Sequence, residues 1–171
     1  MGHSRIAYFS VMPQPGQFEA NYSQRLDAFT GLIRSLTLEK NDDYIQLPSL
    51  KEATIPATDI AICNALNIWR KMKRAPTAII CSNDFYALRM IRQANILGIR
   101  IPDEFSLIGI DNLPVGESSF PALTSVDHNT EEMGRLSVET LLKRLNNPNH
   151  PTRKISCSAS LNIRESVLRL K

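Results

Sequence analysis

The chain has 171 residues, which is enough for one ordinary domain or for one lobe of a larger protein. Its hydrophobic fraction of 43% is typical of a folded globular chain, and a net charge of +3 gives little support to direct nucleic-acid binding. The sequence shows no helix-turn-helix or zinc-finger motif, no signal peptide and no apolar run long enough to span a bilayer.

The chain contains three cysteines, each within an apolar stretch: Cys63, Cys81 and Cys157. Their odd number and irregular spacing are typical of reduced, buried thiols, which favours a cytoplasmic protein over a disulfide scaffold. The three histidines do not have metal-ligand spacing, and none lies in a context that suggests activation of a thiol. We therefore expect no metal site and no catalytic cysteine.

The first half of the chain alternates between short apolar runs and segments with helical spacing. Runs of strand length lie at 5–11, 44–47 and 77–81. Apolar residues at helical spacing predict helices over 21–38 and 59–72, with a loop over 48–56 before the second helix.

The second half continues the alternation. Helices are predicted over 85–97, closed by Gly98, and over 131–145, where Asn129 and Glu132 have capping-box spacing. Strands are predicted over 105–110 and 123–126, and the segment 155–163 alternates like an edge or antiparallel strand. This order of elements predicts an α/β fold in which a parallel sheet carries helices on both faces.

Four polar side chains follow strands of this predicted sheet. Arg25 lies early in the helix after the first strand, Asn83 and Asp84 lie in the turn after the third, and Asp111 lies just past the fourth. In such a sheet they share the carboxyl edge, where ligands bind. A guanidinium, an amide and two carboxylates suit a ligand rich in hydroxyl groups. Because no nucleophile–base pair or phosphate-binding loop accompanies them, we expect binding without catalysis and without a cofactor.

Each of these residues also has a purely structural interpretation. Asn83 and Asp84 are both good helix N-caps, and Asp111 with Asn112 could form a plain turn. Arg25 could lie on a solvated helix face. The residues alone therefore predict an α/β lobe with a polar crevice.

Three longer segments resemble the LacI/GalR family of bacterial transcription regulators: PTAIICSNDFYA at 76–87, GIRIPDEFSLIGIDN at 98–112 and NIRES at 162–166. Shorter matches at 2–7, 24–29 and 123–126 extend the resemblance over nearly the whole chain. The resemblance implies a periplasmic binding protein-like type I lobe, Rossmann-like in its three layers. It also implies a cleft for a small effector, expected to be a sugar or a sugar derivative.

The resemblance divides the chain into three parts. Residues 1–126 correspond to the second lobe of the effector-binding domain, and residues 127–154 to a hinge crossing and a helix that would pack on a first lobe. Residues 155–171 correspond to the closing strand and tail. The family's helix-turn-helix and most of its first lobe have no counterpart here. We therefore expect a fragment that reaches operator DNA only through a missing N-terminal domain.

Carried over residue by residue, the resemblance makes Arg25, Asn83 and Asp111 effector contacts, whereas Asp84 is expected to hold the turn. The chain departs from the family at Ala28, where glycine is frequent, and at Arg89, where a small residue is common. The aromatic wall that usually faces a sugar ring is expected from residues 44–60, with no individual residue assigned.

The resemblance also implies a homodimer, with an interface formed by residues 85–97 and 115–123. The apolar candidates are Leu88, Ile91 and Phe120. The helix over 131–145 gives a second reason to expect self-association, because its apolar stripe would lack the first lobe. It should pack on another copy, fold back on its own lobe or be disordered, and we favour the first outcome because exchange of an element is a low-cost route to dimers.

We thus predict the effector-binding and dimerisation part of a cytoplasmic, ligand-responsive transcription regulator. The alternative is a periplasmic solute-binding protein, since a fold alone does not decide function. An enzyme is not expected. The sequence leaves open the effector, the operator and whether the regulator represses or activates.

Overall fold

A six-stranded sheet forms the body of the protein in a computed structural model, which describes residues 1–12, 20–50, 54–149 and 151–170. The strands are β1 (Ile6–Phe9), β2 (Ile45–Gln46), β3 (Ala78–Cys81), β4 (Ser106–Ile110), β5 (Thr124–Asp127) and β6 (Ser160–Asn162). Their order is β2-β1-β3-β4-β5-β6, with only the β5–β6 pair antiparallel. The predicted α/β class is confirmed, and 155–163 forms an antiparallel strand only over its last part.

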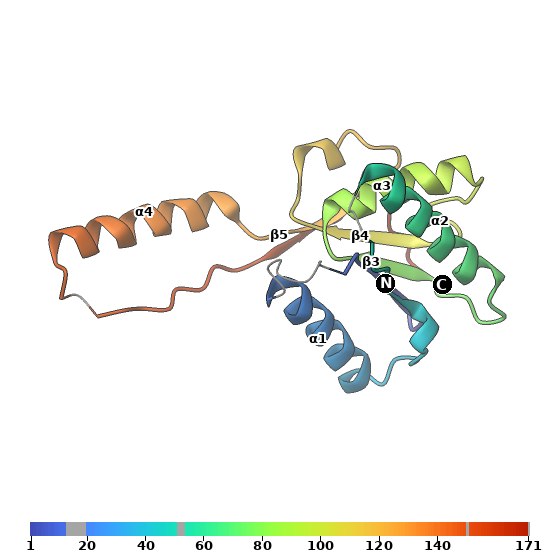
Figure 1. Cartoon of the computed structure of the whole chain (residues 1–171), viewed down its shortest axis with the longest axis horizontal. Helices are drawn as coiled ribbons and strands as arrows, with labels where there is room; N and C mark the ends of the chain where they lie inside the picture. Colours follow the sequence, from blue (N-terminus) through green and yellow to red (C-terminus); the bar gives the residue numbers. More distant parts are fainter. Residues whose placement is uncertain (13–19, 51–53, 150, 171) are drawn as a thin grey trace.

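In the described part of the chain, four α-helices accompany the sheet: α1 (Ala20–Ser35), α2 (Ile55–Lys71), α3 (Asp84–Ile96) and α4 (Thr130–Asn146). Alternate residues of the strands face opposite layers, as the twofold period of a strand requires. Tyr8 of β1 packs with Phe29 and Ile33 of α1 on one face. Phe9 belongs to the larger core that α2 and α3 cover on the other face. The three helices therefore lie on both sides of the sheet (Figure 1).

Two helix boundaries differ from those predicted. α2 begins at Ile55 because Thr54 is its N-cap, with the hydroxyl accepting from the Ala57 amide at 3.3 Å. Pro56 lies in the first turn, where its missing N–H costs nothing. The loop predicted over 48–56 was therefore wrong at its C-terminal end, because residues 55 and 56 belong to α2. α1 ends at Ser35, and Thr37 follows with a positive φ of 52°.

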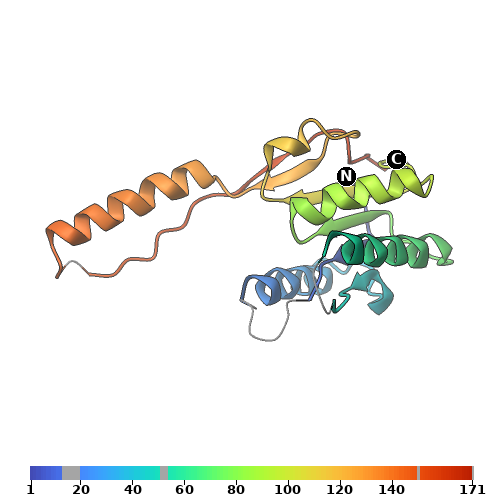
Figure 2. The same cartoon turned by 45° about the horizontal axis from the view of Figure 1, so that its top comes forward.

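The helix α4 stands apart from the body. Its residues are all exposed or half-buried. The helix and residues 151–159, which we call the return segment because they lead into β6, extend away from the sheet (Figures 1 and 2). The predicted capping box was wrong. Asn129 adopts a left-handed conformation with φ 57° and makes no capping hydrogen bond, while Glu132 pairs with Arg135 at 2.5 Å. Asn129 cannot cap from this conformation because an N-cap side chain acts from extended backbone.

The buried thiol of Cys81 gives a first testable expectation. Cys81 is 0% exposed on β3, and burial raises the pKa of its thiol far above the ordinary value. Since the thiolate is the reactive species, Cys81 should resist iodoacetamide at pH 8 in the native protein and react in denaturant. Cys157, half-buried in the return segment, provides an internal comparison. Mass spectrometry that found both residues modified at the same rate in the native state would contradict this expectation.

Candidate functional site at the carboxyl edge of the sheet

The strand order reverses between β1 and β3, because the chain moves from β1 to one side for β2 and to the other for β3. Ligands of open α/β sheets bind outside the carboxyl ends of the strands at such a point. Ser10 follows β1 and Ser82 follows β3, and their hydroxyl oxygens are hydrogen-bonded at 2.7 Å. This buried pair joins the two strand ends beneath the candidate site, and the sequence argument did not identify it.

Arg25 of α1 reaches across this edge. Its Nη1 donates to the carbonyl of Ser82, and its Nη2 donates to Asp111 Oδ1 at 3.3 Å. The structure thus brings together two residues predicted for the site from positions 86 apart in the sequence. The Arg25 and Asp111 side chains are 30% and 35% exposed, so both remain accessible to a small molecule.

Asn83 lies at the same edge, next to Ser82. Its Oδ1 accepts from the amide of Tyr86 at 3.0 Å, which makes it the N-cap of α3. The structural interpretation thus accounts for its amide oxygen. A contact between Asn83 and an effector stays a prediction.

Asp84 points into the protein instead of toward the edge. It is 0% exposed, and its carboxylate accepts from the Leu113 amide at 2.7 Å and from the Ser125 hydroxyl at 2.6 Å. Gly109 of β4 provides the space, because a Cβ there would overlap with Asp84 Oδ1. Asp84 therefore ties the start of α3 to β5 and to the turn that carries Asp111.

That turn has an unusual backbone. Asp111 has a φ of 115° and Asn112 a φ of 50°, both in the region that favours glycine. Hydrogen bonds hold it: the Asp111 amide donates to the Val126 carbonyl at 2.9 Å, and the Asn112 amide donates to the Ser125 hydroxyl at 3.0 Å. Non-glycine residues held in this region cluster at functional sites, which favours a functional interpretation of Asp111 over a plain turn.

His128 also lies at this edge of the sheet and was not predicted from the sequence. Its Nε2 lies 3.3 Å from Asp111 Oδ1 and 3.2 Å from Arg25 Nη2. The sequence indicated neither a metal site nor an activated thiol at the histidines, and no binding role was predicted for His128. The available signal was position, because His128 directly follows β5 as Asp111 follows β4.

Residues 44–60 do not supply the expected aromatic wall. Their one aromatic residue is Tyr44, which is buried just before β2 at the amino edge of the sheet. Its hydroxyl oxygen lies 2.7 Å from the carbonyl oxygen of Arg74 and 3.2 Å from Glu39 Oε1, and either oxygen can accept its one hydrogen. The ring therefore packs in the core, away from Arg25 and Asp111.

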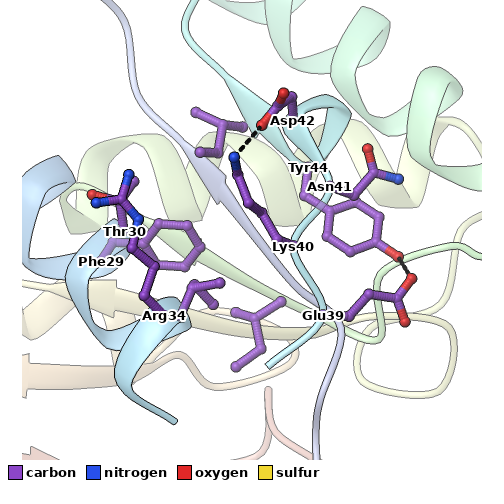
Figure 3. Close-up of a pocket in the computed structure, with 11 residues that line it drawn as sticks. Phe29, Thr30, Arg34, Glu39, Lys40, Asn41, Asp42 and Tyr44 are labelled. Carbon is purple, nitrogen blue, oxygen red and sulfur yellow. Dashed lines mark hydrogen bonds and ion pairs between the residues drawn. The ribbon is translucent and has the colours of Figure 1, made fainter. Parts of the chain in front are cut away.

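A cavity of about 180 Å³ lies at that amino edge, between α1 and the 3-10 turn Asp42–Tyr44 (Figure 3). Phe29 contributes to its apolar lining, and Lys40 and Asp42 form an ion pair at its rim with 3.7 Å between Nζ and Oδ1. Hydrogen bonds from Arg74 hold the pKa of Glu39 below its ordinary value. Glu39, Lys40 and Asp42 at this rim thus have charged partners, and the cavity is separate from the Arg25–Asp111 edge.

The predicted dimer contacts lie in different surroundings. Phe120 is 85% exposed, and Leu88 is half-buried against the core. Ile91 is 4% exposed and points into the core, so naming it as a surface contact was wrong. Arg89 forms a two-point ion pair with Asp59 and so joins α3 to α2 of the same chain.

Within the described ranges, no group of three histidine, cysteine, aspartate or glutamate side chains is placed to hold a metal ion. The same residues include no helix that combines the length and apolar character needed to cross a membrane.

Comparison with known proteins places these features in context. A model of the periplasmic binding protein-like domain matches residues 1–167. The HTH-type transcriptional repressor PurR of Vibrio parahaemolyticus is 31% identical over 99% of this chain and 47% of that protein. The ribose operon repressor of Haemophilus influenzae is 34% identical over 56% of this chain and 29% of that protein. The chain spans about half the length of the curated PurR relatives that it matches from end to end.

Solved structures agree in fold. The complex of the regulator CelR with cellobiose has a TM-score of 0.76 at 24% identity, covering 96% of this chain and 47% of that chain. A LacI family regulator from Enterococcus faecium with bound ribose has a TM-score of 0.77 at 24% identity, covering 99% and 59%. These similarities support the predicted type I lobe.

Proposed function

Because the chain belongs to the periplasmic binding protein-like domain family, we propose that it is the effector-binding part of a ligand-responsive transcription regulator. The curated relatives carry the names of transcriptional repressors, which confirms the resemblance to the LacI/GalR family. They also favour a regulator over the alternative of a periplasmic solute-binding protein, and hence a cytoplasmic protein. We keep the division into residues 1–126, 127–154 and 155–171 as part of this proposal.

The contact between Arg25 and Asp111 at the reversal of strand order carries the proposal. A guanidinium can donate to a hydroxyl group and a carboxylate can accept from one, so the pair can bind adjacent hydroxyl groups of a sugar. Asn83 is proposed as a third contact, and Asp84 as the residue that holds the turn. None of these roles requires a catalytic group, a metal or a cofactor.

Ribose is the first ligand to test, because one relative is named a ribose operon repressor and one similar structure contains ribose. Cellobiose is the second. A ligand that binds only the folded protein stabilises it, by about 2.7 kcal/mol at a concentration of 100 times Kd. Thermal unfolding with each sugar should therefore show a concentration-dependent rise in Tm. An unchanged Tm across a broad panel of sugars would contradict a sugar effector.

Operator DNA is proposed to bind through a domain outside residues 1–171. The chain alone should therefore bind DNA weakly, without sequence preference, and lose that binding as salt is added. Gel shifts at 50 and 200 mM salt check this expectation. A sequence-specific shift that persisted at the higher salt concentration would overturn it.

A further inference from the structure

His128 lies where the chain leaves the sheet. From here the arm, which we define as α4 with residues 147–149 and 151–159, extends away from the body (Figure 1). The imidazole Nε2 is 3.2 Å from Arg25 Nη2 and 3.3 Å from Asp111 Oδ1. A single ring at the base of the arm thus contacts both charged groups of the candidate site.

The donors and acceptors around this ring favour one of its tautomers. Arg25 Nη2 carries two hydrogens, and two acceptors lie within reach: Asp111 Oδ1 at 3.3 Å and His128 Nε2 at 3.2 Å. Both hydrogens are used when Nε2 is unprotonated and the ring carries its proton on Nδ1. In the other tautomer a proton on Nε2 would donate to Asp111 Oδ1 at 3.3 Å, and Arg25 would keep Asp111 and the Ser82 carbonyl as acceptors but lose Nε2.

We propose that His128 is a positioning residue, whose unprotonated Nε2 accepts from Arg25 and holds the guanidinium against both Asp111 and the base of the arm. The charged groups around the ring are Arg25 from α1, Asp111 from the turn after β4 and the neighbouring Asp127. The ring at the end of β5 therefore contacts residues of α1 and of the turn after β4.

The backbone beside His128 is fixed to the same turn. Asp127 accepts from the Asn129 amide at 2.7 Å and from the Asn112 side chain at 3.1 Å. Asn112 in turn accepts from Arg164 Nη2 at 2.9 Å. Because Asn112 follows Asp111 directly, a shift of the Asp111 turn is passed to Asp127 at the base of the arm and to Arg164 beyond the far end of β6.

This arrangement makes His128 a competitor of the ligand, a step that rests on the proposed function. A sugar hydroxyl that accepts from Arg25 Nη2 takes the hydrogen now given to Nε2. Released from Arg25, the ring is free to take the tautomer with the proton on Nε2. Ligand binding at the edge of the sheet would then change the contact that anchors the arm.

The tautomer can be measured without any ligand. In the chain labelled with ¹⁵N-histidine, long-range ¹H–¹⁵N spectra distinguish the two tautomers, and His128→Gln assigns the signals. The wild-type ring should carry its proton on Nδ1, and Arg25→Ala should move it toward Nε2. Arg34→Ala, an exposed arginine on the same helix, should leave it unchanged. A wild-type ring protonated on Nε2, or signals unaffected by Arg25→Ala in a folded variant, would overturn the inference.

Adding ribose separates this inference from the proposed function. If ribose raises Tm, the His128 nitrogen signals should move in the direction that Arg25→Ala produces. Binding of ribose without any movement would overturn the competition while leaving the sugar effector intact. If ribose does not bind, the proposed effector fails, and the comparison of wild type with Arg25→Ala still decides the role of His128.

Discussion

Gly109→Ala is expected to destabilise the protein by about 1–3 kcal/mol, the usual cost of forcing extra atoms into a packed interior. The new methyl group would overlap with the carboxylate of Asp84 and lie 3.1 Å from Leu123 Cδ2. If Asp84 moves aside, the Leu113 amide and the Ser125 hydroxyl lose their acceptor. Each hydrogen bond to a charged group is worth about 1.5–3 kcal/mol, so moving Asp84 to relieve the overlap would itself destabilise the protein.

Gly134→Ala is the matched control for this prediction. Gly134 lies within α4, and a Cβ there meets nothing within 4 Å. Alanine is favoured over glycine in a helix interior by about 0.8–1 kcal/mol, so this variant should be neutral or slightly stabilised. Urea denaturation of both variants measures the difference. Equal free energies of unfolding for Gly109→Ala and Gly134→Ala would refute the role assigned to Asp84.

Self-association through α4 is the second large effect that we expect. The apolar stripe of α4 consists of Val138, Leu141, Leu142 and Leu145, spaced as one helix face and each more than half exposed. Burying one leucine is worth about 1.5–3 kcal/mol, so leaving the stripe in water is unfavourable. The resemblance implies that this helix packs on a first lobe. For residues 1–171 on their own, we propose that a second copy of the chain covers the stripe.

The charges of α4 favour an antiparallel pair. Its first turn carries Glu131 and Glu132 and its last turn carries Lys143 and Arg144, so two antiparallel copies place opposite charges side by side. Such a contact is symmetric, as a twofold dimer requires.

Leu141→Glu together with Leu142→Glu should therefore convert a concentration-dependent dimer into a monomer. Leu32→Glu is the control, since Leu32 is 57% exposed on α1 and Leu141 is 58% exposed on α4. Light scattering over a range of concentrations measures the change. A wild-type monomer at high concentration with an ordered, exposed α4 would contradict this proposal.

The order and type of the elements could be predicted from the sequence because apolar periodicity reports them directly. Boundaries depend on single capping residues. Thr54 and Pro56 extend α2 toward its N-terminus, while Asn129 fails as a cap because its backbone is left-handed. Ile91 was misplaced for a related reason, since periodicity identifies an apolar residue but not which layer covers it.

The proximity of Arg25 and Asp111 was predictable, because parallel strands end at one edge of the sheet. The direction of Asp84 was not, because it depends on the space that Gly109 leaves on the neighbouring strand. The position of His128 directly after β5 was a usable signal, but its contacts depend on strand pairing and on the long side chain of Arg25, which local sequence does not show.

The central claim is that the edge of the sheet around Asp111 binds a small hydroxyl-rich effector, and calorimetric titration with ribose of three proteins tests it most directly. Wild type should bind. Asp111→Ala should bind more weakly by about 1–3 kcal/mol, the cost of leaving ligand hydroxyl groups without their charged acceptor. Asp103→Ala, which removes a carboxylate 60% exposed to solvent, should bind like wild type. Equal affinity of wild type and Asp111→Ala for ribose would contradict the site.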